Sequence, residues 1–190
     1  MNLPLSHILF LKNISAIEFR NPELSYKILL LGFYELILNN IIEVNCINEN
    51  IIISKKNNTE NKFYNLLINP IQNSNLPLQK YVTRIGIYGH YLSNIFSKKS
   101  IKKILISELK NSRILNSRKL LFVTKYKIRE DIDKALENFD YKLEKSKMER
   151  LVKSKIKFEE NIFSKFNETI EMELKRSVDP IGWGINSLGK

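Results

Sequence analysis

Cysteine and histidine are almost missing from this sequence. Its 190 residues include one cysteine, Cys46, and two histidines, His7 and His90. A single cysteine excludes an internal disulfide and fits a reducing compartment, so we expect a cytoplasmic protein. Neither histidine has a second candidate ligand at metal-binding spacing. The GxSxG, P-loop, HExxH, GxGxxG and Cys/His zinc motifs are also missing. We therefore predict that the protein is not an enzyme and needs no metal or cofactor.

Long apolar runs are missing as well. None approaches the length of about 20 residues that spans a bilayer. The amino terminus also lacks the basic and apolar segments of a signal peptide. The chain is long enough for one domain with a substantial core. We place a single globular domain at residues 1–176 and a C-terminal tail at 177–190, because Asp179-Pro180 breaks helical structure.

Arginine is scarce, whereas lysine is abundant. The chain has 7 arginines and 24 lysines, and its net charge is +11. Such an excess favours polyanionic partners. Isoleucine, asparagine and lysine all have A/T-rich codons, so genome composition can raise the lysine count, and charge alone does not identify the partner. The shortage of arginine weighs against base reading, because arginine is the preferred reader of guanine.

The segment from Ser97 to Val123 combines dense positive charge with a regular apolar pattern. Four lysines fall in the first turns of a predicted helix, namely Lys98, Lys99, Lys102 and Lys103. Its apolar face is formed by Ile101, Ile104, Leu105 and Leu109. We expect this helix to end near Asn111-Ser112. A short strand, a turn at Asn116–Arg118 and a second strand at Lys119–Val123 would then complete a helix–hairpin unit.

The first half of the chain shows the same order of elements. Leu24–Leu38 is apolar on nearly every side and predicts a helix in the core. Ile41–Val44 and Ile51–Ser54 predict a hairpin that follows it. Glu35, the only acid within that helix, is expected at a helix edge or as a cap on a neighbouring helix. The predicted fold class is mainly α with short β-hairpins (α+β), a helical bundle containing two winged-helix-like helix–hairpin units.

The remaining elements are predicted from apolar spacing and from turn residues. A short helix is expected after Pro4, within Leu3–Leu11. Further helices are expected at 63–71, 78–96 and 129–139, and one long helix or two packed ones at 142–176. Linkers are expected at 73–77 and 124–128.

Over residues 3–128 the pattern resembles the Golgi phosphoprotein 3 family of peripheral membrane proteins. The resemblance lies in the apolar opening, in the passage Glu35–Val44, and in Leu109–Leu115 with Lys119–Val123. It implies a mainly helical protein that binds phosphatidylinositol 4-phosphate at a shallow basic pocket. It also implies contacts with cytosolic tails of membrane proteins, and a peripheral Golgi location if the source is eukaryotic.

The resemblance also implies a headgroup site. Two family arginines, one turn apart on the basic helix, fall on Lys99 and Lys102, which share a face. A family tryptophan in the first loop falls on Arg20. With the neighbouring Lys103, these residues form the expected site for phosphate: Arg20, Lys99, Lys102 and Lys103. Trp183, between two glycines, is either an anchor for a membrane or partner or a side chain packed on the body.

Two other readings remain open. In the first, the basic helix is the recognition element of a winged-helix nucleic-acid binder, and the turn at Arg118-Lys119 is its wing. In the second, the chain is a structural subunit of a larger complex and its lysines face RNA or an acidic partner. Binding to duplexes with a steep salt dependence would favour the former, and copurification with the complex would favour the latter.

Overall fold

The computed structural model describes residues 3–14, 22–90, 101–120 and 123–178. Within these ranges it contains eight α-helices and two antiparallel sheets. The helices are α1 (Leu5–Lys12), α2 (Pro22–Leu38), α3 (Lys62–Ile68), α4 (Leu78–His90), α5 (Ile101–Asn111), α6 (Glu130–Glu137), α7 (Tyr141–Ile156) and α8 (Glu160–Val178). The strands are β1 (Ile42–Ile47), β2 (Asn50–Lys55), β3 (Leu76–Pro77), β4 (Leu115–Leu120) and β5 (Val123–Ile128).

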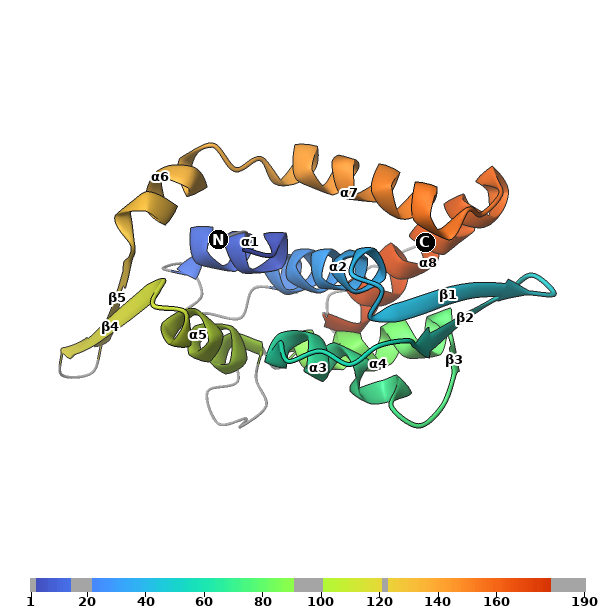
Figure 1. Cartoon of the computed structure of the whole chain (residues 1–190), viewed down its shortest axis with the longest axis horizontal. Coiled ribbons are helices and arrows are strands. Elements are labelled where there is room, and N and C mark those ends of the chain that lie inside the picture. The colour runs from blue at the N-terminus through green and yellow to red at the C-terminus, as the bar shows by residue number, and fades with distance from the viewer. Residues whose placement is uncertain (1–2, 15–21, 91–100, 121–122, 179–190) are drawn as a thin grey trace, which may run out of the picture.

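Helix α2 forms the centre of the core. Thirteen of its 17 residues are buried, and α1, α3, α4, α7 and α8 all pack on it. Gly32 permits the approach of α3, since a Cβ atom there would lie 2.7 Å from Cε1 of Phe63. In Figure 1, α7 runs along one side of α1 and α2, whereas α3, α4 and α5 lie on the other side. A helix that is apolar all round requires this complete cover.

The two hairpins extend from opposite ends of the molecule (Figure 1). Strands β1 and β2 pair antiparallel, and the short strand β3 adds to β2. Asn48 and Glu49 join β1 to β2, and their φ angles are positive, at 48° and 62° respectively. Two such residues form the type of two-residue turn that suits the twist of a hairpin. Strands β4 and β5 form a separate two-stranded ribbon.

The predicted fold class, mainly α with short β-hairpins, is confirmed. The central helix, the first hairpin and the helix after Pro4 lie where the pattern placed them. The charged region 142–176 forms two helices, α7 and α8, and each packs on α2. Helix α8 continues to Val178, past the predicted boundary at 176.

The predicted turn at Asn116–Arg118 is wrong, because these residues lie inside β4. The predicted linker at 124–128 is also wrong, because it is strand β5. Asn116 and Arg118 alternate with Leu115 and Ser117, so they occupy one exposed face of a ribbon. Asparagine and serine gave a turn signal, but strand pairing decides the structure. Arg118 is thus a strand residue and not the tip of a wing.

The expected linker at 73–77 contains strand β3, since Leu76 pairs with Ile53 and Pro77 with Ile52. Pro77 is tolerated there because β3 is an edge strand. Of the predicted helix 78–96, the part up to His90 is confirmed, and the rest lies outside the described residues.

Candidate functional site

Helices α2 and α5 end in the same way, and this shared ending sets the direction in which each hairpin leaves its helix. Asn40 and Arg113 adopt the left-handed conformation, with φ angles of 57° and 55°. The amide of Ile41 donates to the carbonyl of Leu36 at 2.9 Å, and the amide of Ile114 donates to that of Leu109 at 2.9 Å. This is the Schellman pattern of helix termination. The chain leaves both helices along the same path.

The base of each hairpin is also closed in the same way. Lys56 donates its amide to the carbonyl of Ile41 at 2.9 Å, and Arg129 donates to Ile114 at 3.0 Å. Both isoleucines are buried. The expected repetition of a helix–hairpin unit is therefore present in detail, and positions in the two hairpins correspond one to one.

Helix α5 is fixed to the body through its apolar face and through its one acid. Ile101, Leu105 and Leu109 are buried, as the spacing predicts. Glu108 accepts hydrogen bonds from the backbone amides of Lys62 and Phe63, at 2.5 and 3.3 Å, and thereby caps α3. Its second oxygen lies 3.0 Å from Nε2 of His7. These contacts fix α5, and with it the lysines that α5 carries, to the body of the protein.

The positive charge of the chain is concentrated in this second unit. Residues 98–129 contain 11 of the 31 lysines and arginines but only one of the 20 acids, Glu108. This segment therefore carries +10 of the net charge of +11. A compositional bias toward lysine would be spread along the chain. The concentration of positive charge in residues 98–129 therefore points to a role for the charge of this segment, and not to a bias in overall composition.

One face of the β4–β5 ribbon is a row of exposed cations, which we call the cationic face: Arg118, Lys125 and Lys127. Arg118 stands directly opposite Lys125, and Lys127 stands opposite Asn116. All are exposed, and none forms an ion pair with a carboxylate in the described part of the chain. Like charges directly opposite each other on a ribbon cost free energy, up to about 1 kcal/mol.

The first hairpin shows that the fold does not need this charge. Counted from Ile41 and Lys56, the positions that match the cationic face hold Asn45, Ile52 and Ser54. Residues 42–56 contain two glutamates and two lysines, whereas residues 115–129 contain five basic residues and no acid. Two hairpins with the same framework thus differ in charge.

Of the residues predicted to hold phosphate, Lys102 and Lys103 lie in the first turn of α5. Lys102 is half-buried and Lys103 is exposed, and both make further contacts. Arg20, Lys99 and Trp183 lie outside the described residues, so the expected meeting of Arg20 with Lys99 stays a prediction. The sequence reading missed Arg118, Lys125 and Lys127 as a group. A charge count for each segment would have found them.

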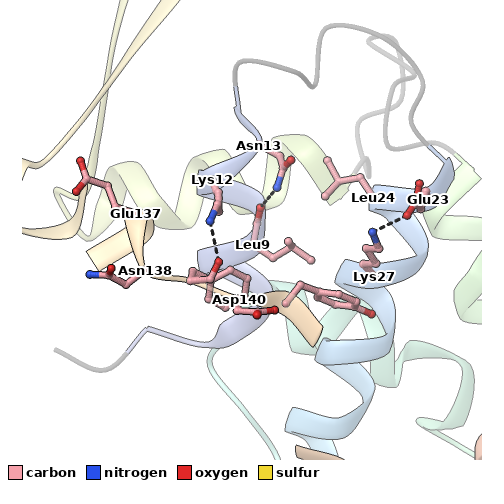
Figure 2. A pocket seen from close by; sticks show the side chains of 11 residues that line it. Leu9, Lys12, Asn13, Glu23, Leu24, Lys27, Glu137, Asn138 and Asp140 are labelled. Atoms are coloured by element: carbon pink, nitrogen blue, oxygen red, sulfur yellow. Dashed lines mark hydrogen bonds and ion pairs between the residues drawn. The ribbon is translucent and has the colours of Figure 1, made fainter. Parts of the chain in front are cut away.

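A cavity of about 620 Å³ lies between α1, the start of α2 and the α6–α7 connection, away from the β4–β5 ribbon. Figure 2 shows Lys12 reaching across to this connection, where its ammonium donates to the carbonyl of Phe139 at 2.7 Å. Lys27 pairs with Glu23 at 2.5 Å. Glu137 and Asp140 add further negative charge to its wall. With both lysines engaged, this cavity is a poor phosphate site.

No protein-family model matches the chain, and no curated protein matches it. Within the described ranges no helix has the length and apolarity to cross a bilayer. The same ranges contain no cluster of three or more histidine, cysteine, aspartate or glutamate side chains that could hold a metal ion.

Proposed function

We propose that α5 and the β4–β5 ribbon form a docking surface for an anionic membrane. The observation that carries this proposal is the difference between the two hairpins. The fold tolerates a hairpin of zero net charge at β1–β2, with no cations at the matching positions, yet β4–β5 retains opposed cations that cost stability. Charge that a fold does not need, and that no carboxylate within the described residues offsets, is best explained by an anion outside the chain.

The sequence at the end of the ribbon favours a membrane over a nucleic acid. Leu121 and Phe122 join β4 to β5, and the ribbon ends with Leu120 and Val123 on either side of them. The corresponding turn of the first hairpin is polar, with Asn48 and Glu49. An apolar sequence between lysines, here Leu120–Val123 between Lys119 and Lys125, is of the kind that suits a bilayer interface, where apolar side chains enter the acyl region and ammonium groups stay among headgroups.

The expected strength fits reversible docking. Each basic residue near an anionic surface contributes about 1 kcal/mol. The three cations of the cationic face thus contribute about 3 kcal/mol. Lys103, Lys110 and Arg113 are exposed on and just after α5 and can add to this. The lipid that the family resemblance implies is phosphatidylinositol 4-phosphate, with Arg20, Lys99, Lys102 and Lys103 at its headgroup.

Flotation with vesicles tests the proposal. The protein should float with vesicles containing phosphatidylserine or phosphatidylinositol 4-phosphate and not with vesicles of phosphatidylcholine alone. Preference for the phosphoinositide at matched surface charge, lost in a K99E/K102E variant, would support the headgroup site. Equal flotation with neutral vesicles would exclude electrostatic docking. Tighter binding to duplex DNA or RNA, with a steep salt dependence, would favour the nucleic-acid reading instead.

A further inference from the structure

A cleft of about 510 Å³ lies where the start of α2, the start of α7 and the end of α8 meet. Its wall is largely apolar and includes Pro22, Val178 and the rings of Tyr26 and Tyr141. None of its lining residues belongs to α5 or to the β4–β5 ribbon, so the cleft is separate from the membrane surface proposed above. Clefts of this size with mostly apolar walls are the usual binding sites on proteins.

Most of the charged groups around this cleft already have partners. Three of its four lysines are ion-paired: Lys27 with Glu23 at 2.5 Å, Lys145 with Glu149 at 3.3 Å and with Glu171 at 2.6 Å, and Lys175 with Glu171 at 3.4 Å. Two of these lysines also lie over a tyrosine ring. Paired charges attract an ion only weakly, whereas an apolar wall gains from any apolar group that covers it. The cleft therefore favours an apolar occupant.

Lys142 is the exception among these lysines. It lies on the rim of the cleft, is exposed, and forms no ion pair with any residue that the structure describes. A single negative charge beside the start of α7 would complement it. The best-matched occupant is thus mainly apolar and carries one negative charge at its edge.

The segment that follows α8 has this composition. Residues 179–190 lie outside the described residues, and their sequence is DPIGWGINSLGK. Asp179 is the one acid in this segment, and residues 180–189 contain no charged side chain, whereas 27% of the whole chain is charged. A segment so poor in charge gains little from solvation and more from packing on an apolar wall.

The apolar side chains of this segment alternate with glycines. Ile181, Trp183 and Ile185 are separated by Gly182 and Gly184. Alternate residues of an extended chain point to the same side, so the three large side chains can face one surface together. The two glycines add no side chain on the opposite side, which suits a segment laid along a cleft.

The point of attachment brings this segment to the cleft. Val178, the last residue of α8, is itself part of the wall. Pro180 prevents the helix from continuing and favours an extended conformation at Asp179. Trp183 is the fifth residue after Val178, and five extended residues span at most about 17 Å. This short tether gives Trp183 a high effective concentration at the cleft.

We propose that the C-terminal segment folds back and that Trp183 occupies this cleft, with Asp179 beside Lys142. Burial of a large aromatic ring supplies most of the gain, because aromatic side chains bury the greatest apolar area. Trp183 is thereby assigned to the body of the protein. Docking on a membrane is left to α5 and the β4–β5 ribbon.

Tryptophan fluorescence tests the burial, because Trp183 is the only tryptophan of the chain. Without vesicles, its emission in the full chain should be blue-shifted relative to the urea-unfolded chain, and acrylamide should quench it about threefold less or lower still. W183A should lower Tm by about 5 °C or more, whereas N186A, a polar change in the same segment, should stay within about 2 °C.

Disulfide trapping tests the location. In a C46S background, K142C/I185C places one cysteine on the rim of the cleft and one in the C-terminal segment. K147C/I185C is the matched control, since Lys147 is exposed on the same helix but does not line the cleft. Seven extended residues from Val178 span up to about 24 Å, so a segment without a fixed seat would form both disulfides at similar rates. The intrachain disulfide of K142C/I185C should form at least about tenfold faster than that of the control.

Four results would overturn this proposal. The first is a tryptophan as accessible to acrylamide in the native chain as in urea, and the second is equal disulfide rates in the two variants. The third is a linkage between positions 142 and 185 of different copies, which would seat a second copy in the cleft. The fourth is a tryptophan that becomes shielded only when anionic vesicles are added, which would make Trp183 a membrane anchor. Failure of flotation changes none of these measurements, so the cleft and the membrane surface are tested separately.

Discussion

Glu35 and Glu108 occupy the same position in the two helix–hairpin units, and each caps another helix. Glu35 is the sixth residue before Ile41, and Glu108 is the sixth before Ile114. Glu35 accepts from the amide of Ser6 at 3.0 Å, near the start of α1, just as Glu108 accepts from the start of α3. His7 connects them, because its ring contacts the Ser6 hydroxyl at 3.2 Å and Glu108 at 3.0 Å.

This polar chain ties α1, α2, α3 and α5 into one body. Glu35 also accepts from the hydroxyls of Ser6, at 2.6 Å, and Tyr64, at 3.2 Å. Every member is satisfied, and a fully satisfied buried network fixes one arrangement of its helices. The helix that carries the cationic unit is therefore held by the same network as the core.

Glu35 predicts a pH dependence of stability. Burial raises the pKa of its carboxyl above the ordinary value of 4.5, although hydrogen bonds from Ser6 and Tyr64 oppose this. The folded state then holds the proton more tightly than the unfolded state does. The stabilising contribution is complete below pH 4.5 and is lost as pH rises through the folded pKa.

An E35Q variant cannot ionise, so its free energy of unfolding relative to that of the wild type should rise between pH 4 and pH 7, by about 1.4 kcal/mol for each unit of raised pKa. Urea unfolding of both proteins at the two pH values measures this. A wild type that gains stability relative to E35Q as pH rises would contradict the raised pKa.

Arg113 predicts a stabilising substitution. Its φ angle of 55° is costly for a side chain with a Cβ, and Arg113 is exposed. R113G should raise the free energy of unfolding by about 0.5–1 kcal/mol. N40G, at the matching position of the first unit, should gain less, because asparagine tolerates this conformation better. A larger gain for N40G than for R113G, measured by urea unfolding, would refute this reasoning.

The α4–α8 interface predicts a coupled pair of substitutions. A Cβ atom at Gly86 would overlap the Cβ atom of Ser177. G86A should therefore destabilise the protein by about 1–3 kcal/mol. S177G removes the obstacle, so the double variant should be more stable than the sum of the two single changes predicts. Strictly additive changes in the free energy of unfolding would contradict a steric contact between positions 86 and 177.

The apolar pair Leu121-Phe122 in the sequence between β4 and β5 predicts which class of ligand loses affinity when it is made polar. L121S/F122S removes two side chains that would each contribute about 1.5–3 kcal/mol on burial. Binding to anionic vesicles should fall at least tenfold, whereas any binding to duplex DNA should stay within twofold. A loss of DNA binding with unchanged vesicle binding would reverse the assignment of partner.

Local pattern was sufficient to predict most of the fold. Helix α2 was predictable because it is apolar on every side, and β1–β2 because apolar strands flank a polar turn. The β4–β5 register was not, because cations at Arg118, Lys125 and Lys127 hide the alternation with Leu115, Tyr126 and Ile128. The cationic face was not predicted either, because its three cations come together only when β4 and β5 pair.

The contact between Glu35 and Ser6 and the closeness of Lys145 to Glu171 were beyond sequence reasoning for a different reason. These pairs join helices that are distant in the chain, and only tertiary packing decides their partners. Glu35 was expected either at a helix edge or as a cap on a neighbouring helix, and the structure shows the second alternative, with α1 as the capped helix.

The most direct test of the membrane proposal is quantitative flotation of R118Q/K125Q/K127Q with anionic vesicles, beside a control with the same loss of charge. K147Q/R150Q/K165Q is that control, since all three residues are exposed and lie on α7 and α8. Loss of about 3 kcal/mol should weaken binding of the ribbon variant about a hundredfold. The control variant should stay within about threefold of the wild type. Equal weakening of both variants would show that only net charge matters and would contradict docking through β4–β5.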